Sequence, residues 1–304
     1  MAGPIALGRD AIAEKGWLAA HKWLLLRRFS QLGVLGLFLL GPWAGIWIIK
    51  GNLSSSLLFD AIPMTDPMVF LQVLAGGFVA PLSTAVTGVA IVTLFYALVG
   101  GRLYCSWVCP VNLVTDAANR LREVLDLRGS ARLSRNTRYW MLAMVLILAA
   151  ATGSLAYEMI NPVSMLHRAL IFGIGALWGV TGLVLLGVFL FDLLVAKRGW
   201  CGHLCPMGAT YGLIGVVSPL RVRADLRERC NDCMECFVVC PEPHVIKPAL
   251  KGGEKGVGPV ILAGDCTNCG RCIDICSKEV FGFGLRFNND VRRDGPVGAD
   301  HPIG

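Results

Sequence analysis

Charged residues are scarce in this chain of 304 residues, where Asp, Glu, Lys and Arg together make up 16%. Hydrophobic residues make up 55%, and the mean hydropathy is +0.60. This composition is too apolar for a soluble globular protein of this length. The sequence therefore predicts a membrane protein with a polar tail.

The sequence also lacks a C-x-x-C-H run, which excludes covalent attachment of a c-type haem. No ladder of Cys or His residues crosses its long apolar stretches. A relay of metal or haem groups from one membrane face to the other is therefore not encoded in this chain alone.

Four charge-free stretches are present: Phe29 to Ile49, Pro67 to Gly101, Tyr139 to Tyr157 and Ala169 to Phe191. A hydrocarbon core of about 30 Å needs roughly 20 helical residues, so each stretch can provide a membrane span. The second stretch is too long for one span, and Gly76, Gly77 and Pro81 interrupt it. We expect an interfacial or re-entrant piece at its start, followed by a helix from about Phe78 to Val99; the rival is one long tilted helix.

Basic residues predict the orientation in the membrane. Five lie between Arg9 and Arg28, and seven arginines lie between Arg102 and Arg138, whereas the other two loops are nearly bare. Because cytoplasmic loops are enriched in Lys and Arg, we expect four spans in a bacterial inner membrane, with both termini in the cytoplasm.

The first stretch is too long for a signal-peptide core, so we expect it to be retained in the mature protein. The net charge of +7 then needs no nucleic-acid partner, because the arginines anchor the chain at anionic lipid.

Eight of the twelve cysteines form two C-x2-C-x2-C-x3-C runs, which bacterial ferredoxins use to hold two 4Fe-4S clusters. The fourth cysteine of each run ligates the other cluster. We therefore assign two ligand sets: Cys230, Cys233, Cys236 and Cys276, and Cys266, Cys269, Cys272 and Cys240. The alternatives are two zinc sites, which usually separate two cysteine pairs by a long spacer, and a disulfide framework, which needs an oxidising compartment. Pro241 fits the ferredoxin pattern, whereas Ser277 replaces the second proline.

The other four cysteines lie in two motifs of the form aromatic-C-x3-C-P, each directly after an apolar stretch: Cys105, Cys109, Cys201 and Cys205. Their positions predict two parallel hairpin repeats whose motifs face each other beneath the membrane. Four thiols brought together are able to ligate a third metal or cluster, form exchangeable thiol pairs, or dock a partner's cofactor. The alternative is that they are buried small apolar residues.

The predicted fold is an α-helical membrane protein with four transmembrane helices and a small C-terminal α+β ferredoxin domain. We divide it into a cytoplasmic N-terminal segment (1–28), a four-helix membrane domain (29–219), a two-cluster ferredoxin domain (220–287) and a disordered tail (288–304).

These motifs and their order resemble the NapH/MauN family of ferredoxin-type membrane proteins. The phrases TDPMVFLQ at 65–72 and NPVSMLHR at 161–168 resemble its NapH branch. The resemblance covers the chain from Arg27 to Phe287. It implies a quinol dehydrogenase subunit that delivers electrons towards a periplasmic nitrate reductase, together with a periplasmic iron-sulfur partner of the NapG type.

A quinol site needs groups that accept protons at the membrane edge. Glu158, His167 and Arg168 are the expected candidates on the periplasmic side, because ionisable residues at membrane depth are functional candidates by default. The alternative is that they mark helix ends.

The predicted clusters are cytoplasmic and the implied acceptor is periplasmic. Two electron routes stay open: the quinone pool itself, or a partner subunit such as a membrane multihaem cytochrome. A second function also stays open, that of a membrane-bound maturation factor whose C-x3-C-P thiols handle metal or reduce a partner. Redox sensing is disfavoured because the sequence shows no large periplasmic domain.

Overall fold

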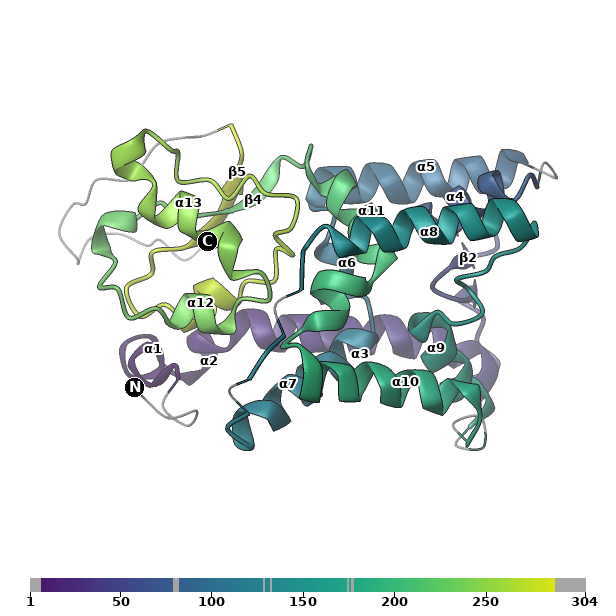
Figure 1. Ribbon diagram of the computed structural model, residues 1–304, viewed down its shortest axis with the longest axis horizontal. Coiled ribbons are helices and arrows are strands. Elements are labelled where there is room, and N and C mark those ends of the chain that lie inside the picture. Colours follow the sequence, from purple (N-terminus) through teal and green to yellow (C-terminus); the bar gives the residue numbers. More distant parts are fainter. Residues whose placement is uncertain are drawn as a thin grey trace.

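The computed structural model describes residues 7–287, except 79–81, 128, 132, 174 and 176–177. The molecule is elongated, with the apolar helices at one end of its long axis and the cysteine-rich C-terminal lobe at the other (Figure 1). The predicted disordered tail at 288–304 lies outside the described residues.

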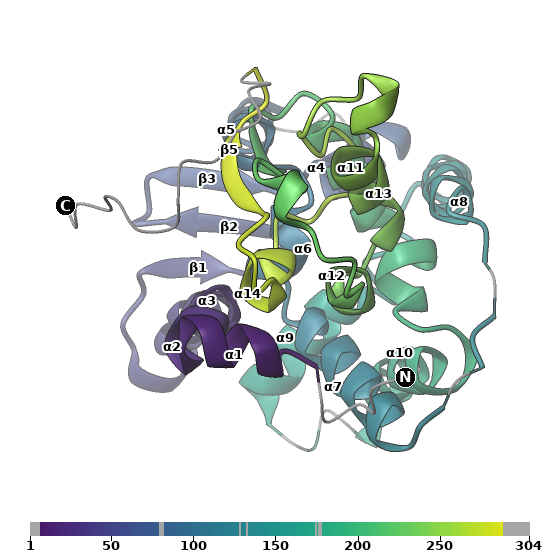
Figure 2. The ribbon, with the colours of Figure 1, turned by 90° about the vertical axis from the view of Figure 1, so that its left-hand side faces the viewer.

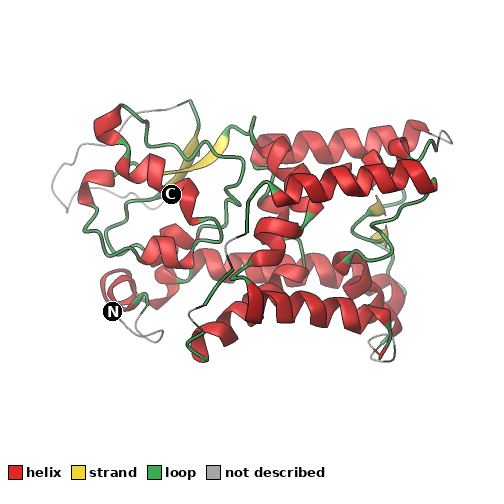
Figure 3. Cartoon of the chain, in the orientation of Figure 1, coloured by secondary structure: helices red, strands yellow, loops and turns green. Residues whose placement is uncertain are grey.

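Apolar helices form the larger end of the molecule, which Figure 3 shows as almost entirely helical. They are α3 (Lys22–Ala44), α4 (Pro67–Ala75), α5 (Leu82–Val99), α8 (Thr137–Thr152), α9 (Pro162–Phe172) and α10 (Val180–Leu190). Among the residues described, α3 alone is long and apolar enough to cross a membrane. Apolar helical stretches at Ser83–Val99, Thr137–Thr152 and Val180–Val195 are shorter.

The helix boundaries differ from the expected apolar stretches. Helix α3, which corresponds to the first apolar stretch, starts at Lys22 and ends before Gly45, which adopts a left-handed conformation at φ 74°. Ile49, the expected end of that stretch, lies in a strand instead. The expected stretch from Ala169 to Phe191 is divided between α9 and α10, and Gly173 at φ 83° follows the end of α9. The second stretch is divided into α4 and α5, which is the broken form favoured above.

A three-stranded antiparallel sheet that the sequence did not predict connects α3 to α4. Its strands are β1 (Ile49–Gly51), β2 (Ser55–Leu58) and β3 (Ile62–Thr65), with Leu57 opposite both Lys50 and Pro63. Strand β3 packs against α5, where a Cβ on Gly88 would lie 2.7 Å from the Thr65 hydroxyl. The missing side chain therefore permits the close approach of sheet and helix.

A second group of helices connects the two ends of the molecule and carries the C-x3-C-P motifs. They are α6 (Leu103–Trp107), α7 (Val111–Val124), the π-helical turns η2 (Phe191–Val195) and η3 (Trp200–Leu204), and α11 (Pro206–Gly215). The prolines of the two motifs stand at new helix starts, since Pro110 directly precedes α7 and Pro206 is the first residue of α11. Proline is favoured there because its φ is already helical.

The C-terminal lobe contains a two-stranded sheet and short helices. Strands β4 (Leu220–Arg223) and β5 (Gly282–Leu285) pair antiparallel, with Val222 opposite Phe283. The helices are α12 (Glu235–Val239), α13 (Ile246–Lys251) and α14 (Arg271–Ile275), joined by the 3-10 turns η4 (Arg227–Arg229), η5 (Pro243–Val245) and η6 (Gly253–Lys255). Its core is apolar and includes Ile246, Ile261 and Phe281.

The N-terminal segment packs against this lobe, as Figure 2 shows for α1 (Arg9–Lys15), α2 (Trp17–Ala20) and α14. The Lys15 ammonium group donates to the backbone oxygen of Ile273 at 2.9 Å. The Asp274 carboxylate accepts from the backbone amides of Trp23 at 3.1 Å and Leu24 at 2.9 Å. The first long helix is therefore capped by a residue of the C-terminal lobe.

Candidate iron-sulfur centres

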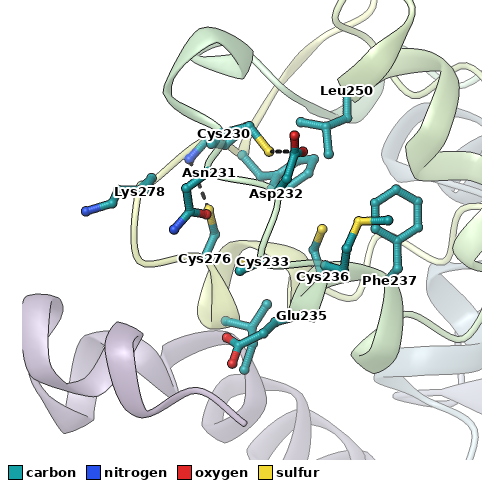
Figure 4. A pocket seen from close by; sticks show the side chains of 14 residues that line it. Cys230, Asn231, Asp232, Cys233, Glu235, Cys236, Phe237, Leu250, Cys276 and Lys278 are labelled. Carbon is teal, nitrogen blue, oxygen red and sulfur yellow. Dashed lines mark hydrogen bonds between the residues drawn. The ribbon is translucent and has the colours of Figure 1, made fainter. Parts of the chain in front are cut away.

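The structure gathers the eight ferredoxin cysteines around two small cavities in the C-terminal lobe. Cys230, Cys233, Cys236 and Cys276 line the first, whose surroundings are drawn in Figure 4. Cys240, Cys266, Cys269 and Cys272 line the second. Each set contains one cysteine from the other run, as in the expected ligand sets. The fourth cysteine of each run reaches the other set because helices α12 and α14, which carry the third cysteines of the two runs, pack against each other.

Matching backbone conformations shape the two cysteine loops. Asp232 and Met234 flank Cys233 with φ of 58° and 61°, and Asn268 and Gly270 flank Cys269 with φ of 46° and 71°. Left-handed residues on both sides of the central cysteine turn the chain tightly around its sulfur. The side-chain oxygen of Asn268 also accepts a hydrogen bond from the Cys266 thiol at 3.5 Å.

All twelve cysteines are free thiols, so the disulfide framework is wrong. Within the described residues, no group of three or more His, Cys, Asp or Glu side chains is spaced for a single metal ion. A four-iron cube holds its thiolates farther apart than one ion does. Four thiols around one cavity thus suit an iron-sulfur cluster as a donor set.

The two C-x3-C-P motifs come together between the helical end and the lobe. Cys109 is buried in the main apolar core, with Cys105 and Cys205 packed against that core. Burial, followed by the charges of Cys105 and Cys205, raises the pKa of Cys109 well above its ordinary value. Burial and then the charge of Cys205 do the same to the pKa of Cys201. The four thiols therefore lie within electrostatic reach of one another.

The second cysteine of each motif stands at the start of a helix. Backbone amides of Val111 and Asn112 interact with the Cys109 sulfur, and those of Met207 and Gly208 interact with Cys205. Such amides favour a thiolate, because they present partial positive charge at the helix start. The arrangement suits cysteines that act as ligands.

A buried ion-pair network joins the two ends of the molecule. Arg102, 1% exposed, donates to Glu242 at 2.8 Å and to the backbone oxygens of Asp265 at 3.0 Å and Cys201 at 2.9 Å. Arg138, also 1% exposed, donates to Glu242 at 3.4 Å and pairs with the Asp265 carboxylate. Burial alone would raise the pKa of Asp265, but His244, Arg138 and Arg102 lower it to about 2.

Sequence reasoning missed the role of these arginines, although a signal was present. Arg102 stands three residues before Cys105, and Arg198 stands three residues before Cys201. Arg198 donates to the backbone oxygen of Val239, next to Cys240, at 2.7 Å. The repeated motif is therefore R-x2-C-x3-C-P, and both arginines contact the segment around Cys240.

One further cavity connects the two kinds of cysteine motif, because Cys105, Cys201 and Cys269 all line it. Arg27 and Arg271 are also in its wall. Although burial raises the pKa of the Cys269 thiol, these two guanidinium groups lower it overall. The serine of helix α6, Ser106, donates to the backbone oxygen of Thr267 at 2.8 Å, which fixes α6 against the second cysteine run.

The structure does not join the predicted quinol residues into one site. Glu158 accepts hydrogen bonds from Ser54 at 2.9 Å and Asn161 at 3.0 Å. His167 is 1% exposed and its ring meets Phe38 edge-on at 5.4 Å, while Arg168 is exposed. The described part of the chain shows no hydrogen bond between Glu158 and His167. Their role in quinol binding stays a prediction.

Known proteins support the iron-sulfur assignment. Residues 83–128 and 178–224 match the family described as a 4Fe-4S binding domain, and residues 229–280 match a 4Fe-4S dicluster domain. Each copy of the first match contains one C-x3-C-P motif. These matches favour iron-sulfur clusters over zinc. No solved structure matches the chain.

Two kinds of full-length relative are similarly close. The chain is 49% identical to the ferredoxin-type protein NapH of Escherichia coli (strain K12) over 285 residues, which cover 94% of this chain and 97% of the relative. It is 51% identical to the methylamine utilization ferredoxin-type protein MauN of Paracoccus denitrificans (strain Pd 1222) over 276 residues, 91% of this chain and 95% of the relative.

Proposed function

Since the chain belongs to the family of ferredoxin-type proteins that includes NapH and MauN, we propose that it is a membrane electron-transfer subunit that oxidises quinol. The electrons would leave through iron-sulfur clusters and partner subunits towards a periplasmic nitrate reductase. The nitrate destination rests on the resemblance to the NapH branch. The similar identity to MauN, a methylamine utilization ferredoxin-type protein, keeps a membrane-bound redox maturation factor as the alternative function.

One observation carries the electron-transfer proposal: one thiol from each C-x3-C-P motif, Cys105 and Cys201, lines a common cavity with Cys269 of the second ferredoxin cysteine set. When bound, iron-sulfur clusters accept and release single electrons. The chain's own residues fix the separation between the thiol sets, because Arg102 and Arg138 join them through buried ion pairs. Two ligand sets are assigned in the lobe, and the C-x3-C-P thiols offer a third.

The proposed location is the bacterial inner membrane, with four crossings and the lobe in the cytoplasm. Helices α5 and α8 have 18 and 16 residues. At 1.5 Å per residue they rise about 27 and 24 Å, slightly less than a hydrocarbon core of about 30 Å. The proposed partners are the quinone pool, a periplasmic iron-sulfur protein of the NapG type and a membrane multihaem cytochrome.

The test is anaerobic purification in detergent with the iron-sulfur partner, followed by addition of a short-chain quinol. Cluster reduction is followed by EPR, and iron is counted per chain. Eight irons would correspond to two clusters and about twelve to three. In the latter case a Cys105→Ser variant should lose about four irons and keep the ferredoxin signals.

The maturation alternative gives a different result. Clusters that stay oxidised with quinol but are reduced by dithionite would contradict the dehydrogenase proposal and favour a metal- or thiol-handling role. The burial of Cys109 argues against thiol exchange, which requires an accessible thiolate.

A further inference from the structure

A large apolar cavity lies between α3 and α5, apart from the cavities lined by cysteines. Its volume is about 460 Å³, which is in the range of small-molecule sites. The sheet β1–β3 closes one side, and α6 and α11 form its inner end. Leu37, Ile91 and Phe95 line it and are 37%, 39% and 52% exposed. The cavity therefore has an apolar mouth on the outer surface of the helices.

The inner end of the cavity is polar. Among the described residues that line it, Asp66 is the one acidic side chain, 3% exposed, and none is basic. The Tyr211 hydroxyl donates to Asp66 Oδ2 at 2.8 Å, while Asp66 Oδ1 accepts from the backbone amides of Met68 and Val69 at the start of α4. The carboxylate is thereby held in place with one oxygen towards Tyr211.

A buried hydroxyl at this end has no partner. The Tyr104 ring stacks on that of Tyr211 with centroids 4.6 Å apart, and the Tyr104 hydroxyl is buried without a hydrogen bond in the described structure. Leaving such a group unpaired costs about 1–3 kcal/mol, so a ligand oxygen here would be favoured. Tyr104 directly precedes Cys105, and Val108, one helical turn further on, also lines the cavity.

We propose that this cavity binds the quinol, with its ring oxygens at Tyr104 and the Asp66–Tyr211 pair and its apolar tail at the mouth between α3 and α5. The inference rests on the proposed function and assigns a site for it. It places the ring beside Tyr104, the residue before Cys105. The expected residue His167 contacts Phe38 of the cavity wall but is not itself among the described lining residues.

Oxidation of one quinol to quinone releases two protons and two electrons. The Asp66 carboxylate accepts the protons one after the other, through the hydroxyl of Tyr211, and passes the first to water before the second leaves the ring. The two electrons go to two one-electron acceptors, the oxidised iron-sulfur clusters that the cysteine sets would hold. No other oxidant is needed for the balance.

Binding tests the site without turnover. The probe is 2-heptyl-4-hydroxyquinoline N-oxide, a fluorescent quinol analogue, titrated into the complete, cluster-loaded chain in detergent. Loss of one buried hydrogen bond should weaken binding roughly tenfold in Asp66→Asn and in Tyr104→Phe. Asp66→Asn keeps an oxygen that can cap α4. Unchanged cluster absorbance and helix content would show that both variants fold.

Two matched controls lie outside the cavity lining. Asp192 is another buried carboxyl group, and Tyr157 is another buried tyrosine whose hydroxyl lacks a partner. Asp192→Asn and Tyr157→Phe should bind the analogue within about twofold of the parent chain, since neither group touches the cavity.

Equal affinity in all four variants, with quinol still reducing the clusters, would overturn this site and leave the proposed function standing. A parent chain that neither binds the analogue nor accepts electrons from quinol would overturn the proposed function and the site together. Affinity for the analogue that falls in Asp66→Asn and Tyr104→Phe, but not in the two control variants, would support the site.

Discussion

At the scale of single residues, the two cysteine loops use the same left-handed conformation with different side chains. The residue after the central cysteine is Met234 in one loop and Gly270 in the other. Met234 is 54% exposed, whereas a Cβ on Gly270 would lie 2.5 Å from the Trp23 ring of α3. Packing against α3, in addition to the turn itself, therefore requires glycine at position 270.

We predict that Gly270→Ala destabilises the fold by about 1–2 kcal/mol from backbone strain alone, plus the cost of displacing Trp23. Thermal unfolding and iron content of the purified protein would measure this. Met234→Ala is the matched control, because that loop already accommodates a Cβ in the left-handed conformation. Equal loss of iron in both variants would contradict the role of Trp23.

The sequence predicted which residues lie together where they recur at a fixed spacing, but not where they stand alone in the chain. The cysteine runs predicted which thiols would lie together, because cluster chemistry dictates their spacing. Arg102 was interpreted as a lipid anchor, since a buried arginine cannot be recognised without its partner. Asp66 and Tyr211, 145 residues apart, carry no pattern that brings them together.

At the scale of elements, two buried arginines share one carboxylate where the helical end meets the lobe. Glu242 is 3% exposed and has Arg102 at 2.8 Å and Arg138 at 3.4 Å. It follows Cys240 and Pro241 directly, so it also fixes the end of the first cysteine run.

Replacing Glu242 by Gln should lower the free energy of unfolding by about 3–5 kcal/mol, because two buried guanidinium groups lose their shared anion. Denaturant unfolding in detergent, followed by circular dichroism, is the measurement. Glu123→Gln removes the same charge from an exposed pair with Arg120 and should cost at most about 1 kcal/mol. Similar losses in the two variants would argue against the buried network.

Element boundaries followed the sequence only in part. Gly76 and Gly77 correctly indicated the break between α4 and α5. Strands β1 to β3 have three or four residues each, too few for an alternating pattern to be visible. The division of α9 from α10 was missed because the stretch is uniformly apolar, and hydropathy does not register a change of chain direction.

At the scale of the whole molecule, the proposal that the chain crosses the membrane four times predicts which helix ends lie on the same side of the membrane. The sheet β1–β3 and the turn between α8 and α9 lie at the end of the long axis opposite the lobe (Figure 1). Exposed probes are available at both ends: Asp60 and Met159 at one, Glu14 and Arg120 at the other.

A membrane-impermeant maleimide added to spheroplasts should label Asp60→Cys and Met159→Cys, because both would face the periplasm. Glu14→Cys and Arg120→Cys should react only after lysis. The parent chain, with its clusters loaded, controls for the native thiols. Labelling of Asp60→Cys without Met159→Cys would show that α5 and α8 do not both cross.

The cap on α3 has a consequence for biogenesis. Asp274 and Trp23 are 251 residues apart, so α3 leaves the ribosome long before the residue that caps it is synthesised. The start of α3 must therefore wait, with its amides unpaired by Asp274, until both cysteine runs have been synthesised. Closure of such a distant contact is entropically costly and slow. Completion of the first long helix is thus coupled to the formation of the lobe that carries the two cysteine runs.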